Sequence, residues 1–392
     1  MLVIRHATLV TPTQRAEDTA VLINGRKIIT VAHDAVLHAP EDADVLDARD
    51  LLLVPGFIDL QLNGAFGHDF TADPASIRPV SEQLPQYGVT SYLPTIITSP
   101  LEIVEQARRE ILSSRSDEYR GAEPLGLHVE GPFLNVKKKG AHNPTYLRDP
   151  DEEAIANWSP ETGVRLVTLA PELPGATAVI GELASRGVVV SAGHSMATYQ
   201  EALTGFAAGI RYGTHLFNAM PALGHRSPGL PAAVLVQPGV VAGLIPDGIH
   251  VHPALIKIIW SLKGPQETNL VSDAMAALGM LPGTYLLNDF EVNVGEEDCR
   301  LANGTLAGSI LPLDEAVRNL MAMTACSLPE ALATVTTTPA KLLDISDDRG
   351  DIRPGMIADI LLLTPDLHVQ TAIAAGKIVY EDNPNQKANS RL

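Results

Sequence analysis

The stretch LGLHVEGPF, residues 125–133, has the alternating pattern of a β-strand that ends on an acidic side chain. Leu127 and Val129 would point to one side of this strand, whereas His128 and Glu130 would point to the other. A buried carboxylate stays ionised only beside a cation or converging hydrogen-bond donors, because an unpaired one takes up a proton. The stretch therefore predicts a strand that brings Glu130 to a partner supplied by another part of the chain.

Similar apolar segments occur on both sides of this stretch, and helical segments separate them. Besides 125–131, the pattern predicts strands at 57–64, 91–95, 164–172, 187–194, 210–218, 240–248 and 269–274. Residues 101–112 and 198–209 have apolar side chains at helical spacing. Eight strands that alternate with helices favour an α/β fold of the (β/α)8 type, the TIM barrel. An open doubly wound sheet is disfavoured, since the sequence contains neither G-x-G-x-x-G nor a P-loop.

Both ends of the chain have a different pattern, made of short strands without helices. Asn24-Gly25 between two apolar runs is a strong hairpin signal. We expect residues 1–54 and 346–383 to pair into one small β-sandwich domain beside a barrel over 55–345, and 384–392 to be a flexible tail. Within the barrel, 284–306 reads as a β insertion, and 327–345 reads as a helix opened by the capping box of Ser327 and Glu330.

The composition limits the classes of partner and compartment. The 392 residues carry a net charge of −18, so neither a nucleic-acid backbone nor an anionic membrane is expected as the main partner. No apolar run reaches about 18 residues and no signal-peptide pattern precedes the first strand, so we expect no membrane span and no secretion. The two cysteines, Cys299 and Cys326, cannot form a disulfide framework, which is typical of a cytoplasmic protein.

Polar residues occupy the ends of four predicted strands. Glu130, His194, His215 and Asp273 close the third, fifth, sixth and eighth strands, and in a (β/α)8 barrel these ends meet at one mouth. One carboxylate and two imidazoles are a usual ligand set for a divalent metal ion with an open position for water. Taken singly, each histidine would more often be a core residue, and Asp273 a turn cap. Their shared location favours a metal site with Asp273 as proton carrier.

Other polar residues near the predicted mouth have a less specific meaning. His128 shares a face with Glu130 but lies deeper, so we interpret it as a buried structural histidine. Most of the run Lys137–Lys139 is interpreted as a solvated loop. Arginine beside backbone donors is a natural receptor for phosphate, although surface arginines are common. Loops that follow the third, sixth and seventh strands carry the remaining candidates: His142, Asn218, His225, Arg226, Asp247 and His250.

Together these motifs resemble the N-acetylglucosamine-6-phosphate deacetylases of the amidohydrolase superfamily. The stretches that carry the resemblance are PGFIDLQLNG, YGVTSYLPTIIT, GLHVEGPFLN, KKGAHNP, VTLAPE, VVSAGHS, THLFNAM, PDGIH, VSDA, LAGS and, near the end of the chain, GDIRPGMIADILLL. The resemblance implies metal ligands at Glu130, His194 and His215, a catalytic acid/base at Asp273, and His142 as a group that polarises the acetamide carbonyl. It also implies a homodimer and a phosphorylated amino sugar bound by Ala141, Asn218, Ala219, Arg226, Asp247, His250, Leu306, Ala307 and Gly308.

One departure from the wider superfamily affects the number of metals. Many members begin the first strand with His-x-His, whereas this chain has Gln61-Leu62-Asn63, and amides are poorer ligands than imidazoles. The fourth strand also ends without a lysine that could be carbamylated to bridge two metals. We therefore expect one divalent ion, zinc first and iron, cobalt or manganese as alternatives. Gln61 and Asn63 would then contact the ligands or the substrate.

The resemblance implies a hydrolase of linear amides that forms glucosamine 6-phosphate and acetate in amino sugar catabolism. An alternative enzyme would act on the galacto epimer, N-acetylgalactosamine 6-phosphate, and the sequence does not separate the two. A deaminase is disfavoured by the phosphate-type loop and the missing His-x-His. A different class, a metal-free barrel that serves as a binding or assembly module, gains some support from the lost histidines of the first strand.

Overall fold

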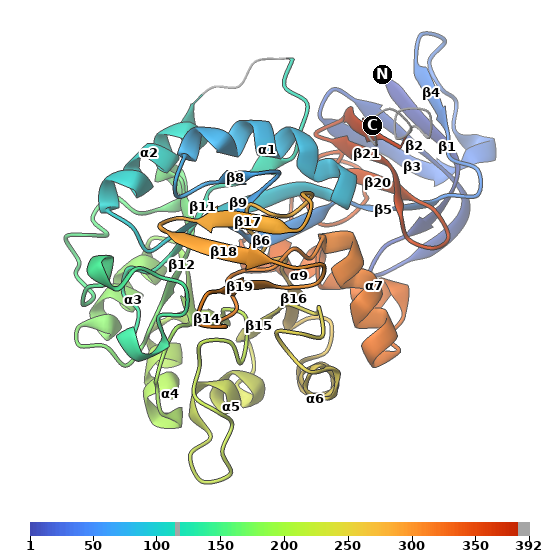
Figure 1. The fold of residues 1–392 in the computed structure, drawn as a ribbon. Helices are drawn as coiled ribbons and strands as arrows, with labels where there is room; N and C mark the ends of the chain where they lie inside the picture. Colours follow the sequence, from blue (N-terminus) through green and yellow to red (C-terminus); the bar gives the residue numbers. More distant parts are fainter. Residues whose placement is uncertain (114–117, 383–392) are drawn as a thin grey trace.

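The computed structural model describes residues 1–113 and 118–382, and these contain the predicted (β/α)8 barrel (Figure 1). Eight parallel strands follow one another around the barrel, and each predicted segment overlaps one of them. They are β6 (Phe57–Leu62), β9 (Val89–Ile97), β11 (Leu127–Glu130), β12 (Val164–Leu169), β13 (Val189–Ala192), β14 (Ile210–Gly213), β15 (Val241–Leu244) and β16 (Thr268–Leu270). The predicted flexible tail, 384–392, lies outside the described residues.

The barrel closes where the first strand meets the segment that follows the eighth. The backbone N–H of Asp273 donates to the carbonyl of Gln61 at 2.8 Å, and Leu62 forms a parallel bridge with Ala274. Because the carboxyl ends of all eight strands meet at this rim, side chains that follow the strands converge there.

Helices surround the barrel as βα units require. They are α1 (Ile77–Gln83), α2 (Leu101–Leu112), α3 (Ala176–Ser185), α4 (Tyr199–Ala208), α5 (Gly229–Val236), α6 (Pro253–Lys263), α7 (Leu313–Thr324), α8 (Leu328–Ala333) and α9 (Thr337–Leu342). Short 3-10 turns add η1 (Asp34–Val36), η2 (Pro74–Ser76), η3 (Leu84–Tyr87), η4 (Val136–Lys138), η5 (Pro144–Tyr146) and η6 (Pro160–Thr162). The helices predicted at 101–112 and 198–209 are confirmed as α2 and α4.

The single helix predicted over 327–345 is wrong, since this segment forms the two helices α8 and α9. The carbonyl of Thr334 accepts a hydrogen bond from the backbone of Leu270, and that of Val335 accepts one from Ile58. These carbonyls accept hydrogen bonds from barrel strands, so they are not available for the hydrogen bonds of a continuous helix. Only the start of the segment is as expected, because the Glu330 carboxylate accepts from the backbone N–H of Ser327 at 2.8 Å.

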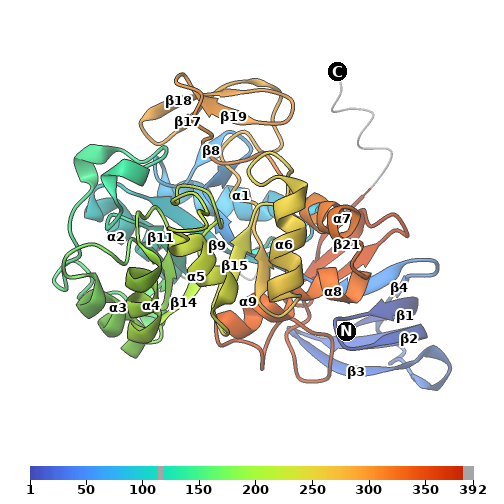
Figure 2. The same ribbon diagram turned by 90° about the horizontal axis from the view of Figure 1, so that it is seen from below.

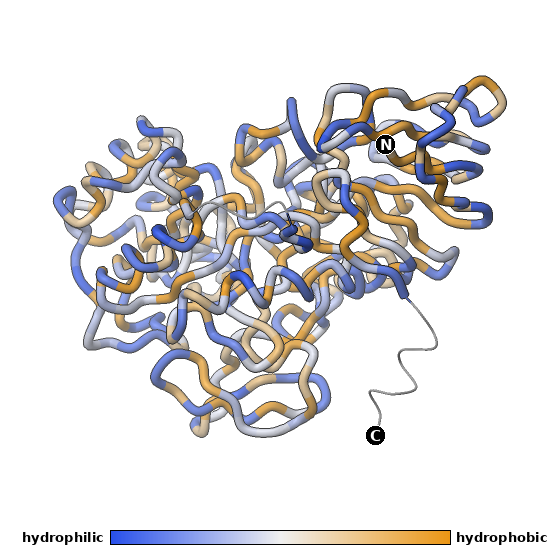
Figure 3. Tube along the Cα trace, turned by 90° about the horizontal axis from the view of Figure 1, so that it is seen from above, coloured by the Kyte–Doolittle hydropathy of each residue, from blue (hydrophilic) through white to orange (hydrophobic). Residues whose placement is uncertain are grey.

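The two chain ends pair into one small β domain, as predicted (Figure 1). Much of the chain in this domain, beside the N label in Figure 3, is orange and therefore hydrophobic. Its strands are β1 (Leu2–Val10), β2 (Arg15–Asn24), β3 (Lys27–His33), β4 (Asp44–Asp47), β5 (Leu52–Pro55), β20 (Ile360–Leu363), β21 (Val369–Ala374) and β22 (Lys377–Glu381). Strand β5 runs antiparallel to β20, which joins the two ends, and Asn24 pairs with Lys27 across the predicted hairpin. The domain encloses its own apolar core, which includes Ile4, Ile23 and Ile360.

A buried ion cluster connects this domain to the barrel. The Arg349 guanidinium contacts the Asp359 carboxylate and donates to the Ser91 hydroxyl of β9 at 2.9 Å. Its other nitrogen lies 2.7 Å from Glu123 of the short strand β10 (Glu123–Pro124), and Arg26 reaches the same carboxylate at 2.8 Å. Because Arg349 is only 5% exposed, loss of this guanidinium would leave buried negative charge.

The predicted β insertion is confirmed as a three-stranded sheet formed by β17 (Gly283–Leu287), β18 (Phe290–Val294) and β19 (Cys299–Leu301). Figure 2 shows this sheet at one end of the barrel, away from the small β domain. Two hydrogen bonds hold the turn between β17 and β18. Asn143 donates to Asp289 at 2.7 Å, and the backbone of Asn288 donates to Asp69 at 2.7 Å. The second bond reaches the small hairpin of β7 (Gly64–Ala65) and β8 (His68–Asp69). The insertion therefore lies over the loops that follow the barrel strands.

No helix of the described chain is both long enough and apolar enough to cross a membrane.

Candidate metal centre and substrate cavity

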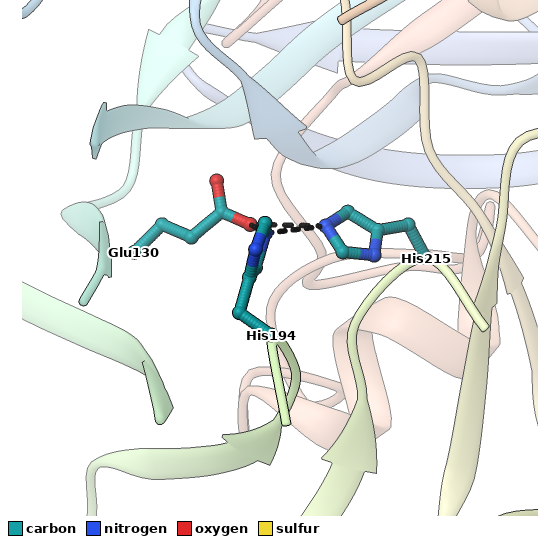
Figure 4. A group of neighbouring side chains, drawn as sticks. All are labelled: Glu130, His194 and His215. Carbon is teal, nitrogen blue, oxygen red and sulfur yellow. Dashed lines mark hydrogen bonds and ion pairs between the residues drawn. The ribbon is translucent and has the colours of Figure 1, made fainter. Parts of the chain in front are cut away.

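Three side chains that the sequence places on separate strands meet at one point at the carboxyl end of the barrel. Glu130 is the last residue of β11, and His194 and His215 follow β13 and β14. Glu130 Oε1, His194 Nε2 and His215 Nε2 form a triangle in which every side is 3.1 Å (Figure 4). All three side chains are buried. The predicted convergence of these residues is thus present in the structure.

The triangle fits a divalent cation by both its size and its chemistry. Tetrahedral bonds of about 2.0–2.1 Å separate neighbouring ligand atoms by roughly 3.3 Å, close to the observed spacing. His194 Nδ1 lies 2.8 Å from the carbonyl of Lys138, and a carbonyl only accepts. Nδ1 therefore carries the proton, and in the neutral ring Nε2 presents a lone pair to Glu130 and His215. Such an outer hydrogen bond is the usual means by which a protein fixes a metal-binding histidine.

Electrostatics around Glu130 favour positive charge at the same point. Burial raises the pKa of Glu130, but the adjacent rings of His194 and His215 prevail and hold it well below its usual range. Burial lowers the pKa of His215, yet the hydrogen bond and charge of Glu130 prevail and raise it. Gln61 Nε2 also donates to Glu130 Oε1 at 3.2 Å. The carboxylate is consequently kept ionised in a site where a cation would be stabilised.

The backbone at these strand ends adopts an unusual conformation. His194, His215 and Asp273 have φ values of 48°, 32° and 48°, in the left-handed region that residues other than glycine seldom occupy. Such conformations cost about 1–3 kcal/mol each and persist where the surrounding fold imposes them, commonly at functional sites. The three residues turn sharply out of their strands, which directs their side chains into the mouth of the barrel.

His142 lies beside the triangle as a neutral hydrogen-bond donor. Its ring is 4.4 Å from that of His194 between centroids, and its Nε2 lies 3.8 Å from Glu130 Oε2. The backbone N–H of Thr98 points at His142 Nδ1 at 3.2 Å, so Nδ1 accepts and the proton sits on Nε2. Burial, followed by the charge of His194, lowers the pKa of His142 to about 3. The ring is therefore uncharged near neutral pH and offers its Nε2–H toward the site.

Asp273 is buried and has a single strong side-chain donor close by. Asn63 Nδ2 donates to Asp273 Oδ1 at 2.8 Å. Burial raises the pKa of Asp273 to about 6, although the charge of His215 acts in the opposite direction. A carboxyl group with that pKa can both accept and release a proton near neutral pH.

A cavity of about 630 Å³ opens above these residues. Most predicted substrate residues line it: Asn63, Ala141, Asn218, Ala219, His250, Leu306, Ala307 and Gly308. Gln61 is buried below the cavity against Glu130, and Asp247 lies behind His250, with its Oδ2 2.5 Å from His250 Nδ1. Arg226 is exposed on the loop before α5 and does not line the cavity.

Several cavity residues are absent from the predicted set. Lys137, Lys138 and Lys139 line the wall, and Lys138 and Lys139 are partly buried, so the interpretation as a solvated loop is wrong for these two. The physical reason is that Lys138 Nζ donates to the carbonyl of Met220 at 2.6 Å, which holds its stem against the next loop. Arg300, Asn303 and Thr305 reach the cavity from the β insertion. Their position follows from the fold of the insertion and has no local signal.

Two further histidine environments have local explanations. His128 is fully buried, as predicted, with Nε2 2.8 Å from the Thr168 hydroxyl and Nδ1 3.1 Å from the carbonyl of Leu60. In the small β domain, His6 lies 3.0 Å from Asp18 and 3.6 Å from Asp34. There Arg5 supplies the counter-charge, at 2.9 Å from Asp34.

Comparison with known proteins gives a consistent family. The model of the amidohydrolase family matches residues 52–379. An N-acetylglucosamine-6-phosphate deacetylase of Lysinibacillus sphaericus is 35% identical over 385 residues, which is 97% of this chain and 98% of that protein. The human N-acetylglucosamine-6-phosphate deacetylase is 39% identical over 350 residues, covering 86% of this chain and 85% of the human one.

Solved structures agree with these relatives. The crystal structure of N-acetylglucosamine-6-phosphate deacetylase from Pasteurella multocida superimposes with a TM-score of 0.89 at 31% identity, covering 96% of this chain and 99% of that chain. A mutant deacetylase of Mycobacterium smegmatis in complex with N-acetyl-D-glucosamine-6-phosphate gives a TM-score of 0.87 at 31% identity, covering 96% of this chain and 99% of its own. The similarity therefore extends over both the barrel and the small β domain.

Proposed function

This chain belongs to the amidohydrolase family, and we propose that it removes the acetyl group of N-acetylglucosamine 6-phosphate, yielding glucosamine 6-phosphate and acetate. The observation that carries the proposal is the triangle of Glu130, His194 and His215 on the floor of the cavity. It lies in a chain that matches deacetylases of this specificity along nearly its whole length. The activity is a step of amino sugar catabolism.

Glu130, His194 and His215 would hold one divalent ion, and the family is metal-dependent. We propose zinc, with iron, cobalt and manganese as alternatives that the same donor set accepts. A divalent ion bound there supplies a Lewis acid that polarises a carbonyl and makes water acidic enough to react near neutral pH. Gln61 and Asn63 occupy the positions at which a second metal ion would need two imidazole ligands. The Gln61 side chain also donates a hydrogen bond to Glu130, and both features support a single ion.

Asp273 would transfer the proton in both halves of the reaction. As a carboxylate it accepts a proton from the water molecule whose oxygen forms the new bond to the acetyl carbon. The same proton then passes from Asp273 to the amide nitrogen as the carbon–nitrogen bond breaks, so a free amine leaves together with acetic acid, which loses its proton to water and becomes acetate. A pKa of about 6 suits both transfers. Asn63 holds the carboxylate in place throughout.

His142 would stabilise the negative charge that develops on the carbonyl oxygen. Its neutral ring directs Nε2–H toward the site because Thr98 occupies Nδ1. One well-placed donor of this kind typically lowers the barrier by roughly 3–4 kcal/mol.

The phosphorylated end of the substrate would be bound at the cavity wall. We propose Ala141, Asn218, Ala219, His250 and the backbone of 306–308 as its contacts, with Asp247 orienting His250. Support comes from charge: Lys137, Lys138, Lys139 and Arg300 gather at this cavity although the whole chain carries −18. Such local clustering of cations favours an anionic ligand.

Assembly and compartment are also proposals. Arg226 is exposed and does not line the cavity of its own chain. This position supports a homodimer in which Arg226 binds the substrate of the partner subunit. Cys299 and Cys326 are both free thiols, which supports the reducing cytoplasm as the compartment.

Acetate release from N-acetylglucosamine 6-phosphate, measured before and after chelation and after return of zinc, tests the proposed function. We expect release that chelation abolishes and zinc restores, and no release in any state would refute it. Comparing kcat/KM with the galacto epimer identifies the preferred sugar. Metal analysis tests the remaining candidate, a metal-free binding module: about one equivalent of zinc or iron excludes it.

A further inference from the structure

Glu172 follows β12 and touches neither the metal ligands nor the cavity, yet it contacts two loops that shape the site. Its Oε1 accepts from Asn135 Nδ2 at 3.0 Å and from the backbone N–H of Met196 at 2.5 Å. Its Oε2 accepts from the Ser195 hydroxyl at 2.7 Å. Ser195 and Met196 come directly after His194, whereas Asn135 belongs to the loop after β11. One carboxylate therefore joins the loops of two different strands.

The loop held through Asn135 controls the tautomer of His194. The Asn135 backbone donates to the carbonyl of His194 at 2.9 Å, and its side chain accepts from the backbone of Lys137 at 3.0 Å. These bonds shape the turn η4, whose last residue, Lys138, presents its carbonyl to His194 Nδ1 at 2.8 Å. A displacement of this turn would remove the acceptor that keeps Nδ1 protonated and Nε2 open to a cation.

The second loop held by Glu172 is the one that contains His194 itself. His194 adopts a left-handed backbone with φ of 48°, which costs free energy and needs neighbouring contacts to persist. The hydrogen bonds from Ser195 and Met196 to Glu172 fix the two residues that follow this strained position. Both the backbone and the ring of His194 thus depend on the same carboxylate.

We propose that Glu172 is a positioning residue for the metal centre, which sets the affinity for the ion by orienting His194 through Asn135, Ser195 and Lys138. The inference rests on the proposed metal site and adds a residue that has no contact with the ion or the substrate. Outer partners of metal ligands typically change metal affinity by about 10- to 100-fold when removed. We expect Glu172→Ala to weaken metal binding by that factor.

The experiment titrates zinc into the full-length chain, stripped of metal, against a chromogenic chelator of known affinity. The matched control is Glu161→Gln, an exposed carboxylate just before the opposite end of the same strand β12. We expect wild-type affinity for the control and a 10- to 100-fold loss for Glu172→Ala. Glu172→Gln keeps one acceptor oxygen for Asn135 and Met196 and should recover most of the affinity.

Kinetics at saturating zinc distinguish positioning from a general structural defect. If Glu172 acts through His194, excess zinc restores kcat of Glu172→Ala. Unchanged zinc affinity in Glu172→Ala overturns the inference while the proposed function stands. The zinc titration needs no substrate, so it tests the role of Glu172 even if the wild-type protein releases no acetate. A lack of acetate release would overturn the proposed function alone. If Glu172→Ala does not fold, Asn135→Ala removes the same link from the other side, and unchanged affinity in that variant overturns the inference.

Discussion

Replacement of Asn63 by leucine should move the acidic limb of the pH–rate profile to higher pH. Asn63 Nδ2 donates to Asp273 Oδ1 at 2.8 Å in a buried setting, and a hydrogen bond to a charged group contributes about 1.5–3 kcal/mol. At 1.36 kcal/mol per pKa unit, loss of this donor raises the pKa of Asp273 by about 1–2 units, from about 6 to about 7–8. Leucine has nearly the same size, and Asn63 Oδ1 has no hydrogen-bond partner among the described residues, so little else is lost.

The direction in which the acidic limb moves follows from the role of Asp273 as a base. The ionised carboxylate accepts the proton from water, so activity is present above its pKa and is lost as the pH falls through it. Burial places that limb at about pH 6 in the wild-type chain. At pH 7 about nine-tenths of Asp273 is ionised in the wild type, but only between about one-half and one-tenth in Asn63→Leu.

The assay is kcat for acetate release between pH 5 and 9 at saturating substrate and zinc. Asn143→Ala is the control, because Asn143 makes a bond of 2.7 Å to Asp289 in an exposed setting and should leave the limb unchanged. A uniform loss of kcat at every pH, with the limb at its wild-type position, would show that Asn63 does not set the pKa of Asp273. Asn63 would then act on the substrate and not on Asp273.

The remaining predictions concern catalysis, metal binding and domain contacts. Asp273→Asn should lower kcat by about 10²–10⁴-fold while zinc titration shows unchanged affinity, because the proton carrier is lost and the ligands remain. His142→Gln should lower kcat by about 10²–10³-fold, and steady-state kinetics should show little change in KM. Zinc at 100 times its dissociation constant should stabilise the wild-type chain by about 2.7 kcal/mol in urea unfolding, and Glu130→Gln should lose this gain. Arg349→Met should cost about 3–5 kcal/mol in the same assay because a buried carboxylate loses its partner, whereas Lys27→Met, which removes an exposed pair, should cost about 0–1 kcal/mol.

The barrel and its floor were predictable from local patterns. Every predicted strand overlaps a barrel strand, because apolar runs bounded by glycine and polar residues carry the signal themselves. Once the strands are placed, the fold forces residues such as Glu130 and His215 to one rim, so their convergence follows without knowledge of distances.

The features that the sequence did not predict correctly depend on contacts between distant segments. The break between α8 and α9 arises from backbone hydrogen bonds to distant strands, such as the one from Ile58 to Val335, which no helical pattern can reveal. Lys138 reads as a solvated residue because its acceptor, the carbonyl of Met220, comes from another loop. Glu172 contacts residues 37 and 23 positions away, so its position at a strand end is visible in the sequence but its partners are not.

The proposed metal centre is tested most directly by a stoichiometric titration of zinc into the metal-stripped chain, with acetate release from N-acetylglucosamine 6-phosphate as the signal. We expect a linear rise that ends at one zinc per chain, and no rise for Glu130→Ala over the same range. Full activity before zinc is added, or an equal rise in Glu130→Ala, would contradict the claim that Glu130, His194 and His215 hold the ion that the reaction needs.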